Sequence, residues 1–551
     1  MKKILFVSGL SIGVMLVGIS FFAEQIGLDN DSGWGAGRSL ILKTGIALLI
    51  ISALGIVFKD KLTDFGQCIS RAINKFDKIS YSTQMNIFSL PVILIVIASY
   101  IWFAQPNFEA SRFNYYSLLA IAFKKHQLYL VEEPSSALLA LNDPYDYGLR
   151  KRSGIEDFPW DASLYNNKFY LYWGPVPSLI LVFFNIEELS HIGDEYLVLA
   201  FMFGLFFYYV VLSYSIWLRF NQALPSWLFS VSVLAIGLSA PSTWMLNSSR
   251  IYEGAIIGSQ LFFIGGCYWV YSSLNEKSPS PPKLILAGLH WALALGTRIT
   301  ILPVILFATG MTLLYVFKQI KPFSFKSYFP TLLRLCAPLA VAAIGLGWYN
   351  WARFDSVFEF GLKYQLASVN YTTFQNLFST DYINGNLYNY LIHPLKFQKQ
   401  FPYIRAIENR FSNERLAGLL FISPFILYAG LFVKGIVSPK KDQAKGFLDN
   451  WLMLIFAGSA LISALTILSY YFPATRFSED FMPSLLLLAT SSLGLGYRNL
   501  GNNIIRKAYI IFTTLVAIYS VIASSLVAFP PHRAGYAAAF IKGIYQFLGF
   551  R

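Results

Sequence analysis

DFPWDASLYNNKFYLYWGPVPSLILVFF, residues 157–184, decides how the chain is organised. The segment carries Asp157, Asp161 and Lys168, which a lipid-facing helix would not tolerate at its centre. It then continues into the apolar residues 173–184, a run of about a dozen residues that is too short to cross a hydrocarbon core of about 30 Å. We therefore expect an interfacial or re-entrant helix on the outer membrane surface, in the floor of a site.

The composition is that of an integral membrane protein. The chain has 551 residues, of which 56% are hydrophobic and 13% charged, and its mean hydropathy is +0.52. Apolar runs of roughly 18 or more residues, each long enough to cross a bilayer, recur from end to end. The formal net charge is +14, but the Lys and Arg residues lie in short clusters between apolar runs, as in cytoplasmic loops. The charge pattern therefore indicates membrane topology and not nucleic-acid binding.

The apolar runs predict an all-α polytopic membrane protein with about 13 transmembrane helices and two large outer, periplasmic loops. The basic clusters place the N-terminus in the cytoplasm of a cell whose inner (plasma) membrane the chain spans several times. The expected helices cover residues 4–23, 40–58, 87–104, 196–218, 226–246, 251–273, 284–299, 301–317, 333–351, 415–433, 451–471, 482–497 and 507–528. The resulting segments are residues 1–104 with helices 1–3, the first periplasmic loop 105–195, residues 196–351 with helices 4–9, the second loop 352–413, and residues 414–551 with helices 10–13 and a periplasmic tail.

Three short stretches carry a resemblance to a known group of proteins. They are NNKFYLYWGPVPSLIL at 166–181, AGLHWALALGTRITILP at 287–303 and TRFSEDFMP at 475–483. Together with the layout of the spans, they resemble the GT-C superfamily of membrane glycosyltransferases. WDASLYNNKFYLYWGPVP at 160–177 also resembles uncharacterised bacterial multi-span proteins near the protein O-mannosyltransferase and aminoarabinose transferase group.

This resemblance implies a GT-C-like fold and a glycosyltransferase that uses a polyprenyl-phosphate sugar lipid as donor. Transfer of a hexosyl or pentosyl group at the outer face of a bacterial inner membrane would modify a cell-envelope glycan, lipid or protein. Some members of the superfamily use a divalent cation and others do not, so the resemblance leaves the metal open. The cysteines and histidines of this chain show no zinc-ligand spacing.

Two acids are candidates for the catalytic carboxylate, which must take a proton from the acceptor hydroxyl. Asp161 is the first, because it lies between Trp160 and the expected surface helix, where partial burial would raise its pKa. Glu109 is the second, because the family carries an Asp near the start of the first outer loop and Glu109 is the acid in PNFEASRFNYY, residues 106–116. The same pair are alternatives as cation ligands, and for each a solvated loop acid or a helix cap is the simpler interpretation.

Four cations lie near the outer ends of the expected spans, and we consider them candidates for binding a lipid phosphate. They are Arg476, Arg298, Lys168 and Arg250. Arginine can bind a phosphate through two parallel hydrogen bonds. Anchoring in the headgroup layer or pairing with nearby acids is the alternative for each.

Trp160 and Tyr170 belong to a dense aromatic cluster in the opening stretch. Such side chains could stack on a sugar or cover a polyprenyl chain. Tryptophan and tyrosine also gather at membrane interfaces without any ligand, so an interfacial belt is the alternative.

Three functions are compatible with these observations. The first is the glycosyltransferase, and the second is a non-catalytic membrane protein of the same fold that binds lipid or assists envelope assembly. The third is a transporter, which would place ionisable residues near mid-span and show an internal repeat. The polar residues of this sequence instead gather at one face of the membrane, which favours the first two.

Overall fold

The structure is a computed structural model of the whole chain. It describes residues 2–26, 36–57, 78–104, 113–239, 241–247, 249–276, 278–320, 324–374, 376–409, 412, 414–432, 451–530, 535 and 539. Glu109 lies outside these residues. The described chain divides into two compact units, of which the first contains α1 (Lys2–Phe21) and α2 (Ala36–Val57) and the second extends from Met85 through the last helix.

Helices dominate both units, and seven of those described are long and apolar enough to cross a membrane. They are α4 (Tyr81–Ala104), α10 (Asp194–Phe220), α13 (Ile251–Leu274), η1 with α15 (Ile299–Ile301 and Leu302–Gln319), α16 (Phe325–Phe354), α20 (Trp451–Leu468) and α22 (Asn503–Val527). Two expected spans, α14 (Pro281–Thr297) and α21 (Met482–Arg498), are 17-residue helices. The polytopic, mainly helical membrane fold is therefore confirmed, whereas the expected count of about 13 crossings is not.

In the first unit, α1 and α2 form a tightly packed hairpin. A Cβ atom on Gly13 would lie 3.1 Å from the backbone oxygen of Gly45, so the two backbones approach closely. The Arg38 side chain links the start of α2 to the end of α1, because its Nε donates to the carbonyl of Ser20 at 2.7 Å. Small residues at the contact and a satisfied guanidinium suit a helix pair in lipid.

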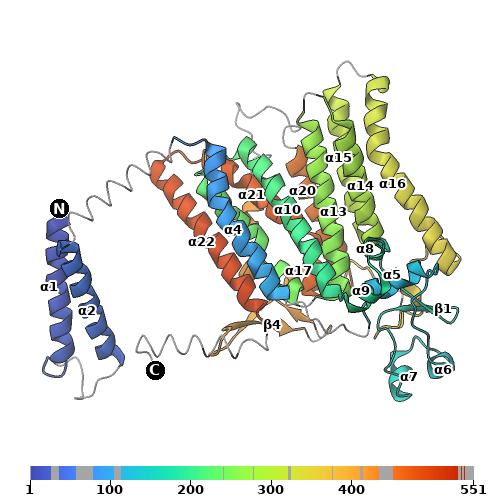
Figure 1. Cartoon of the computed structure of the whole chain (residues 1–551), viewed down its shortest axis with the longest axis horizontal. Helices are drawn as coiled ribbons and strands as arrows, with labels where there is room; N and C mark the ends of the chain where they lie inside the picture. Colours follow the sequence, from blue (N-terminus) through green and yellow to red (C-terminus); the bar gives the residue numbers. More distant parts are fainter. Residues whose placement is uncertain are drawn as a thin grey trace. The chain divides into compact units, whose positions relative to one another are not determined.

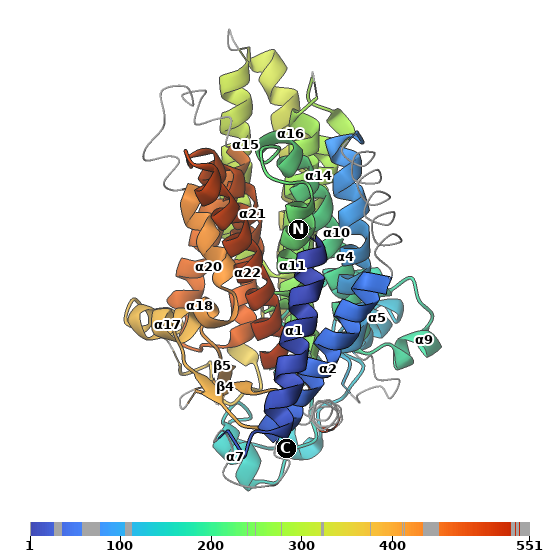
Figure 2. The ribbon, with the colours of Figure 1, turned by 90° about the vertical axis from the view of Figure 1, so that its left-hand side faces the viewer.

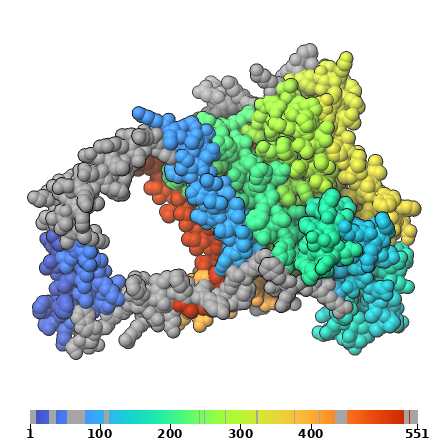
Figure 3. Space-filling view, in the orientation of Figure 1, coloured from blue at the N-terminus to red at the C-terminus, as the bar shows by residue number. Residues whose placement is uncertain are grey.

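In the second unit, α13 is the most enclosed of the membrane-spanning helices (Figure 1). It packs against α10 on one side and α14 on the other. Glycines make this possible, since a Cβ on Gly258 would lie 2.7 Å from the Phe201 ring and one on Gly266 would lie 2.3 Å from the Trp291 indole. In Figure 3, one face of this unit runs from the blue atoms of α4 through the green atoms of α10 to the yellow atoms of α16.

A hydrogen-bonded chain joins three of these helices. Nδ1 of His290 in α14 lies 2.8 Å from the carbonyl of Leu286, so this nitrogen carries the proton and Nε2 accepts. The Tyr208 hydroxyl of α10 donates to Nε2 at 2.7 Å and receives the Trp269 indole N–H of α13 at 3.1 Å. Every member of the chain is therefore satisfied within the bundle.

Helices α20, α21 and α22 complete the bundle, with α20 packed on α21 (Figure 2). Two expected spans differ from the structure in this unit. The segment expected as one helix over 415–433 forms β5 (Arg415–Leu416), α18 (Leu419–Ile422) and η3 (Pro424–Ala429). Pro424 cannot continue the ladder of α18 because it lacks an N–H, and the chain turns there.

The second difference is an interrupted span. Residues expected as one helix over 226–246 form α11 (Trp227–Leu238) and α12 (Ser242–Asn247). Pro241 stands between the two helices, and a proline disfavours helical geometry in the residue before it. The apolar run gave no sign of this break, because hydropathy reports burial and not backbone continuity.

The two large segments between helices fold mainly as short elements. The first contains α5 (Tyr115–Lys124), α6 (Ser136–Leu139), α7 (Tyr147–Arg152), β1 (Ser163–Tyr165), β2 (Lys168–Tyr170), α8 (Val176–Leu181) and α9 (Ile186–His191). The second contains η2 (Leu362–Tyr364), α17 (Tyr382–Leu391), β3 (Leu395–Phe397) and β4 (Ile404–Glu408), with β3–β4–β5 forming a three-stranded sheet. The short helix expected within 173–184 is present as α8, and its place at the membrane surface stays a prediction, as do the five segment boundaries and the side on which the N-terminus lies.

An unexpected hairpin organises the opening stretch of the sequence. Strands β1 and β2 pair antiparallel, with Ser163 opposite Tyr170. Asn166 and Asn167 form the turn with φ of 48° and 58°, the left-handed geometry of a two-residue hairpin that asparagine tolerates. The hairpin directs the residues just before it toward the second segment.

Candidate functional site

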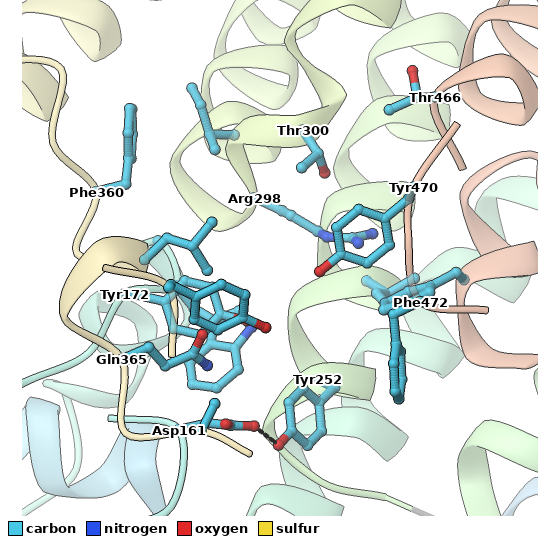
Figure 4. A pocket seen from close by; sticks show the side chains of 18 of the residues that line it. Asp161, Tyr172, Tyr252, Arg298, Thr300, Phe360, Gln365, Thr466, Tyr470 and Phe472 are labelled. Atoms are coloured by element: carbon cyan, nitrogen blue, oxygen red, sulfur yellow. Dashed lines mark hydrogen bonds between the residues drawn. The ribbon is translucent and has the colours of Figure 1, made fainter. Parts of the chain in front are cut away.

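A cavity of about 630 Å³ lies among the two large segments and the ends of several membrane helices. Figure 4 shows its interior, with Asp161 and Tyr252 on one side and Arg298 and Tyr470 further in. Five of the side chains predicted to form a site line it. They are Trp160, Asp161, Arg250, Arg298 and Arg476.

Asp161 is held in place by its backbone. Its N–H donates to the carbonyl of Leu366 at 3.2 Å, and the N–H of Leu366 donates to the carbonyl of Ala162 at 2.9 Å. The buried Arg150 guanidinium donates to the carbonyl of Ala367 beside this pair. The first and second segments are thus joined at the residue that carries the carboxyl group.

The backbone of Asp161 is left-handed, with φ of 63°. This conformation is uncommon outside glycine, and aspartate and asparagine tolerate it better than other residues. Unusual backbone geometry is found preferentially where function requires a side chain in one direction. The chain here directs a carboxyl group into the cavity (Figure 4).

The Asp161 carboxyl is buried, with 9% of the residue exposed. The hydroxyl of Tyr252, in the first turn of α13, donates to its Oδ2 (Figure 4). Burial raises the pKa of Asp161 to about 6, and the Tyr252 hydrogen bond and the charges of Arg476, Arg150 and Arg250 oppose that rise. The group is therefore mainly ionised at neutral pH and still basic enough to take a proton.

Two of the predicted arginines are already paired with acids. Arg298 forms an ion pair with Asp480, and 14% and 11% of these side chains are exposed. Arg476 donates from Nη1 to Glu414 Oε1 at 2.7 Å, and its guanidinium carbon lies 4.7 Å from the centre of the Tyr252 ring. These pairs shape the wall of the cavity and leave little uncompensated charge there.

Arg250 differs from both. It is exposed, it lines the cavity, and no carboxylate of the described residues forms an ion pair with it. Its guanidinium carbon lies 5.9 Å from the Tyr252 ring centre. Arg250 is therefore the predicted cation that remains available to a negatively charged ligand.

Lys168 and Tyr170 do not reach the cavity lining. The Lys168 ammonium lies 4.0 Å from the centre of the Tyr129 ring. Tyr170 is buried, and its ring centre lies 5.2 Å from that of Phe354. Lys168 and Tyr170 are two residues apart in β2 and therefore lie on the same face of the hairpin, where these ring contacts hold them.

Several other residues line the cavity or support its wall and were not predicted from the sequence. Tyr252 and Glu414 were not singled out as site residues, and Arg353 was not considered at all. Arg353 is buried and donates to the carbonyl of Leu171 and to Asn350 Oδ1. A polar residue in the first or last turn of a membrane helix is the signal that would have found Tyr252 and Arg353.

Tyrosines form much of the remaining wall. Tyr172, Tyr371, Tyr470 and Tyr471 line the cavity, and the hydroxyls of Tyr371 and Tyr471 lie 2.8 Å apart. Tyrosine combines an apolar ring with a hydrogen-bonding tip. This wall suits a ligand with both apolar faces and hydroxyl groups, as a sugar has.

The described residues contain no group of three or more His, Cys, Asp or Glu side chains that could hold a metal ion. Asp161 stands among arginines and a tyrosine hydroxyl, and not beside a second described acid in hydrogen-bonding contact. The expected partnership of Asp161 with Glu109 as cation ligands stays a prediction, since Glu109 lies outside the described residues.

No protein-family model matches the sequence, and no curated protein matches it. Among solved structures, the chain is similar to the archaeal oligosaccharyltransferase AglB from Archaeoglobus fulgidus, in complex with an inhibitory peptide and a dolichol-phosphate. The similarity has 13% sequence identity and a TM-score of 0.39, and it covers 80% of this chain and 56% of that chain. A TM-score this low does not establish a shared fold, so the function proposed below is argued from the cavity.

Proposed function

We propose that the protein is a glycosyltransferase that moves a sugar from a polyprenyl-phosphate donor to a hydroxyl acceptor at the outer face of a bacterial inner membrane. The acceptor would be a cell-envelope glycan, lipid or protein. The observation that carries the proposal is the buried Asp161 carboxyl, which faces a cavity of about 630 Å³ at the ends of membrane helices.

Asp161 acts as the general base in this proposal. It accepts the proton of the acceptor hydroxyl while that oxygen bonds to the anomeric carbon, and the bond between that carbon and the phosphate oxygen breaks. The polyprenyl phosphate leaves with the bonding electrons, and the configuration at the anomeric carbon inverts. A base with a pKa near the working pH combines ionisation with proton affinity, and a pKa of about 6 meets this requirement.

Arg250 binds the phosphate of the donor. It forms no ion pair with a described carboxylate, although Glu253 and Asp161 lie within electrostatic range of it, whereas Arg298 and Arg476 are each held in an ion pair. A guanidinium can hold two phosphate oxygens at once and stabilise the charge that develops on the leaving group. The tyrosines of the wall cover the sugar and limit the access of water.

The first test is turnover of a labelled polyprenyl-phosphate hexose by the purified protein in liposomes. We expect Asp161→Asn to lower transfer by about 10²- to 10⁴-fold, the usual effect of removing a general base. Asparagine also tolerates the left-handed backbone, so the fold is retained. Glu156→Gln, which changes an exposed acid of the same segment, is the matched control and should leave turnover unchanged.

Two results would contradict the proposal. Equal turnover by wild type and Asp161→Asn would remove Asp161 from the reaction. Lipid binding without turnover of any donor would favour a non-catalytic protein of the same fold. The outer-face location has its own test, because a cysteine at the exposed Asn384 should react with an impermeant thiol reagent from the periplasmic side.

A further inference from the structure

A second buried polar cluster lies behind the cavity wall, around η5 (Thr475–Asp480) and α12. Several of its side-chain oxygen atoms are buried and have no hydrogen-bond partner among the described residues. They are Tyr209 Oη, Ser213 Oγ, Ser239 Oγ, Thr243 Oγ1 and both carboxyl oxygens of Glu479. Buried oxygens are nearly always satisfied in native proteins, so a group of them in one place indicates a bound water, ligand or ion.

Helix α12 packs against both η5 and α10, which carry Glu479 and Tyr209. The Ser242 hydroxyl, next to Thr243 in α12, lies beside the Glu479 carboxyl. The hydroxyls of Tyr100 in α4 and Tyr209 in α10 lie within electrostatic range of the same carboxyl. Ser213 follows Tyr209 by one helical turn and therefore shares its face of α10.

Glu479 is the ionisable group of the cluster, and 1% of the residue is exposed. Burial and the neighbouring Asp480 raise the pKa of Glu479 to about 8. Asp480 has Arg298 as its ion-pair partner, whereas no cationic side chain of the described residues pairs with Glu479. The carboxyl group is therefore mainly protonated at neutral pH unless a cation occupies the cluster and takes the place of the proton.

The broken span favours a cation. Helix α11 ends at Leu238, so the last carbonyl groups of α11 carry the negative end of its dipole to the break. Tyr100 of α4 donates to one of them, the carbonyl of Gly237, at 2.7 Å, and Figure 2 shows α4, α10 and α11 together on this side of the second unit. Interrupted membrane helices whose carbonyl ends meet side-chain oxygens coordinate Na⁺ in other membrane proteins.

We propose that this cluster binds one Na⁺ ion, held by the Glu479 carboxylate together with the hydroxyl oxygens of Tyr209 and Thr243. All the candidate ligands are oxygen atoms, which hard cations prefer. A single uncompensated carboxylate matches a monovalent ion, since a divalent ion would leave excess positive charge in the interior. The proposal does not depend on glycosyl transfer.

The test uses the purified full-length protein and simple salts as probes. Thermal unfolding is followed by tryptophan fluorescence in NaCl, KCl and choline chloride at equal ionic strength. An ion that binds the folded state raises the melting temperature in proportion to its saturation, so we expect a higher melting temperature in NaCl than in choline chloride. Binding of ²²Na⁺ should reach one ion per chain.

Glu479→Gln removes the charge and should abolish both the Na⁺-dependent shift and the ²²Na⁺ binding. Glu408→Gln, at an exposed acid of β4, is the control and should retain both. If Glu479→Gln does not fold, Thr243→Val and Tyr209→Phe each remove one hydroxyl with little change of shape. Either should raise the half-saturating Na⁺ concentration several-fold.

Three outcomes would overturn the proposal. One is an equal melting temperature in all three salts, which would mean that a proton or water fills the cluster. Another is a full Na⁺ response in Glu479→Gln. The third is an unchanged half-saturating concentration in both hydroxyl variants.

Discussion

The charged side chains on the two sides of the cavity differ in whether they form ion pairs. On the side of the first segment, Asp161 has a tyrosine hydroxyl as its contact, and no cation among the described residues forms an ion pair with it. On the side of η5, Arg476 and Asp480 are each fixed in an ion pair with a partner from another element. Asp161 on the first side therefore keeps its acid–base strength, whereas the ion-paired Arg476 and Asp480 on the second side hold neighbouring elements together.

This difference distinguishes the residue that takes part in the reaction from the residues that hold the elements of the site in place. An ion pair stabilises the charged form of both partners, so a paired carboxyl stays ionised. A buried carboxyl without an ion pair has a raised pKa and can exchange a proton near neutral pH. Variants on the two sides should consequently fail in different ways. Variants of the ion-paired Arg476 and Asp480 should lose stability, and those around Asp161 should lose activity or change its pH dependence.

The largest effect on stability is expected for the η5 side. Asp480→Asn leaves the Arg298 guanidinium without its acid in a largely buried place, and removing one partner of a buried pair costs about 3 kcal/mol or more. We expect a clearly lower melting temperature of the purified protein in detergent. Glu276→Gln breaks the more exposed Lys283–Glu276 pair, in which 29% and 46% of the side chains are exposed, and should change the melting temperature little.

An Asp480→Asn melting temperature equal to that of wild type would mean that the Arg298–Asp480 pair does not stabilise the fold. The double variant Arg298→Met with Asp480→Leu tests the same pair in a second way. Replacing both charges with apolar side chains removes the uncompensated guanidinium, so the double variant should be more stable than Asp480→Asn.

The next effect is on the stability contribution of Asp161, where removing the charge should stabilise the protein and not destabilise it. The pKa of Asp161 is about 6 in the folded protein against an ordinary value of 3.8, so folding is favoured by the protonated form. Its contribution to stability is fully present below pH 3.8 and is lost as the pH rises through about 6. The ionised group therefore lowers stability at pH 7 by ~3 kcal/mol.

Asp161→Asn should accordingly raise the melting temperature at pH 7.5 while lowering transfer by about 10²- to 10⁴-fold. The gain should shrink as the pH falls below 6 toward 4, because wild type then recovers the same advantage by protonation. A melting temperature that is lower than that of wild type across this range would show that Asp161 is a structural ion and not a destabilised catalytic group.

The membrane helices could be predicted well from the sequence, because long apolar runs report the bilayer directly. The interrupted span at Pro241 and the short elements over 415–429 could not, because hydropathy does not distinguish one helix from two short ones. The β1–β2 hairpin was also missed. Its Asn166–Asn167 turn is a recognisable hairpin signal, which the surrounding aromatic residues obscured.

The candidate site was predicted in part. Asp161, Arg250, Arg298 and Arg476 do line one cavity, although they lie far apart in the sequence. Which of the arginines are paired could not be predicted, because the partners Glu414 and Asp480 are chosen by tertiary packing. Tyr252 was missed for the same reason, since its contact with Asp161 crosses 91 residues.

A smaller effect is expected from the tyrosine that contacts Asp161. Tyr252→Phe removes a hydrogen bond to the ionised carboxylate, and such a bond favours the charged form. The pKa of Asp161 should rise further, and the acid limb of the pH–activity profile should move upward by about one pH unit, equivalent to ~1.4 kcal/mol. The profile is measured as transfer rate against pH from 5 to 9. An unchanged acid limb would mean that a group other than Asp161 controls it.

The smallest effect is expected for the exposed Arg250, and it distinguishes the free cation from the paired ones. Because its guanidinium is open to water, its contact with a phosphate is partly screened, and we expect Arg250→Gln to weaken donor binding by about threefold to tenfold, near 1 kcal/mol. The KM for the polyprenyl-phosphate donor should rise while the melting temperature stays that of wild type. Arg476→Gln is the contrasting variant, because it leaves Glu414 without its partner and should lower the melting temperature. If Arg250→Gln instead lowered stability and left KM unchanged, the two arginines would have exchanged roles, and the phosphate would have to be placed at the η5 side of the cavity.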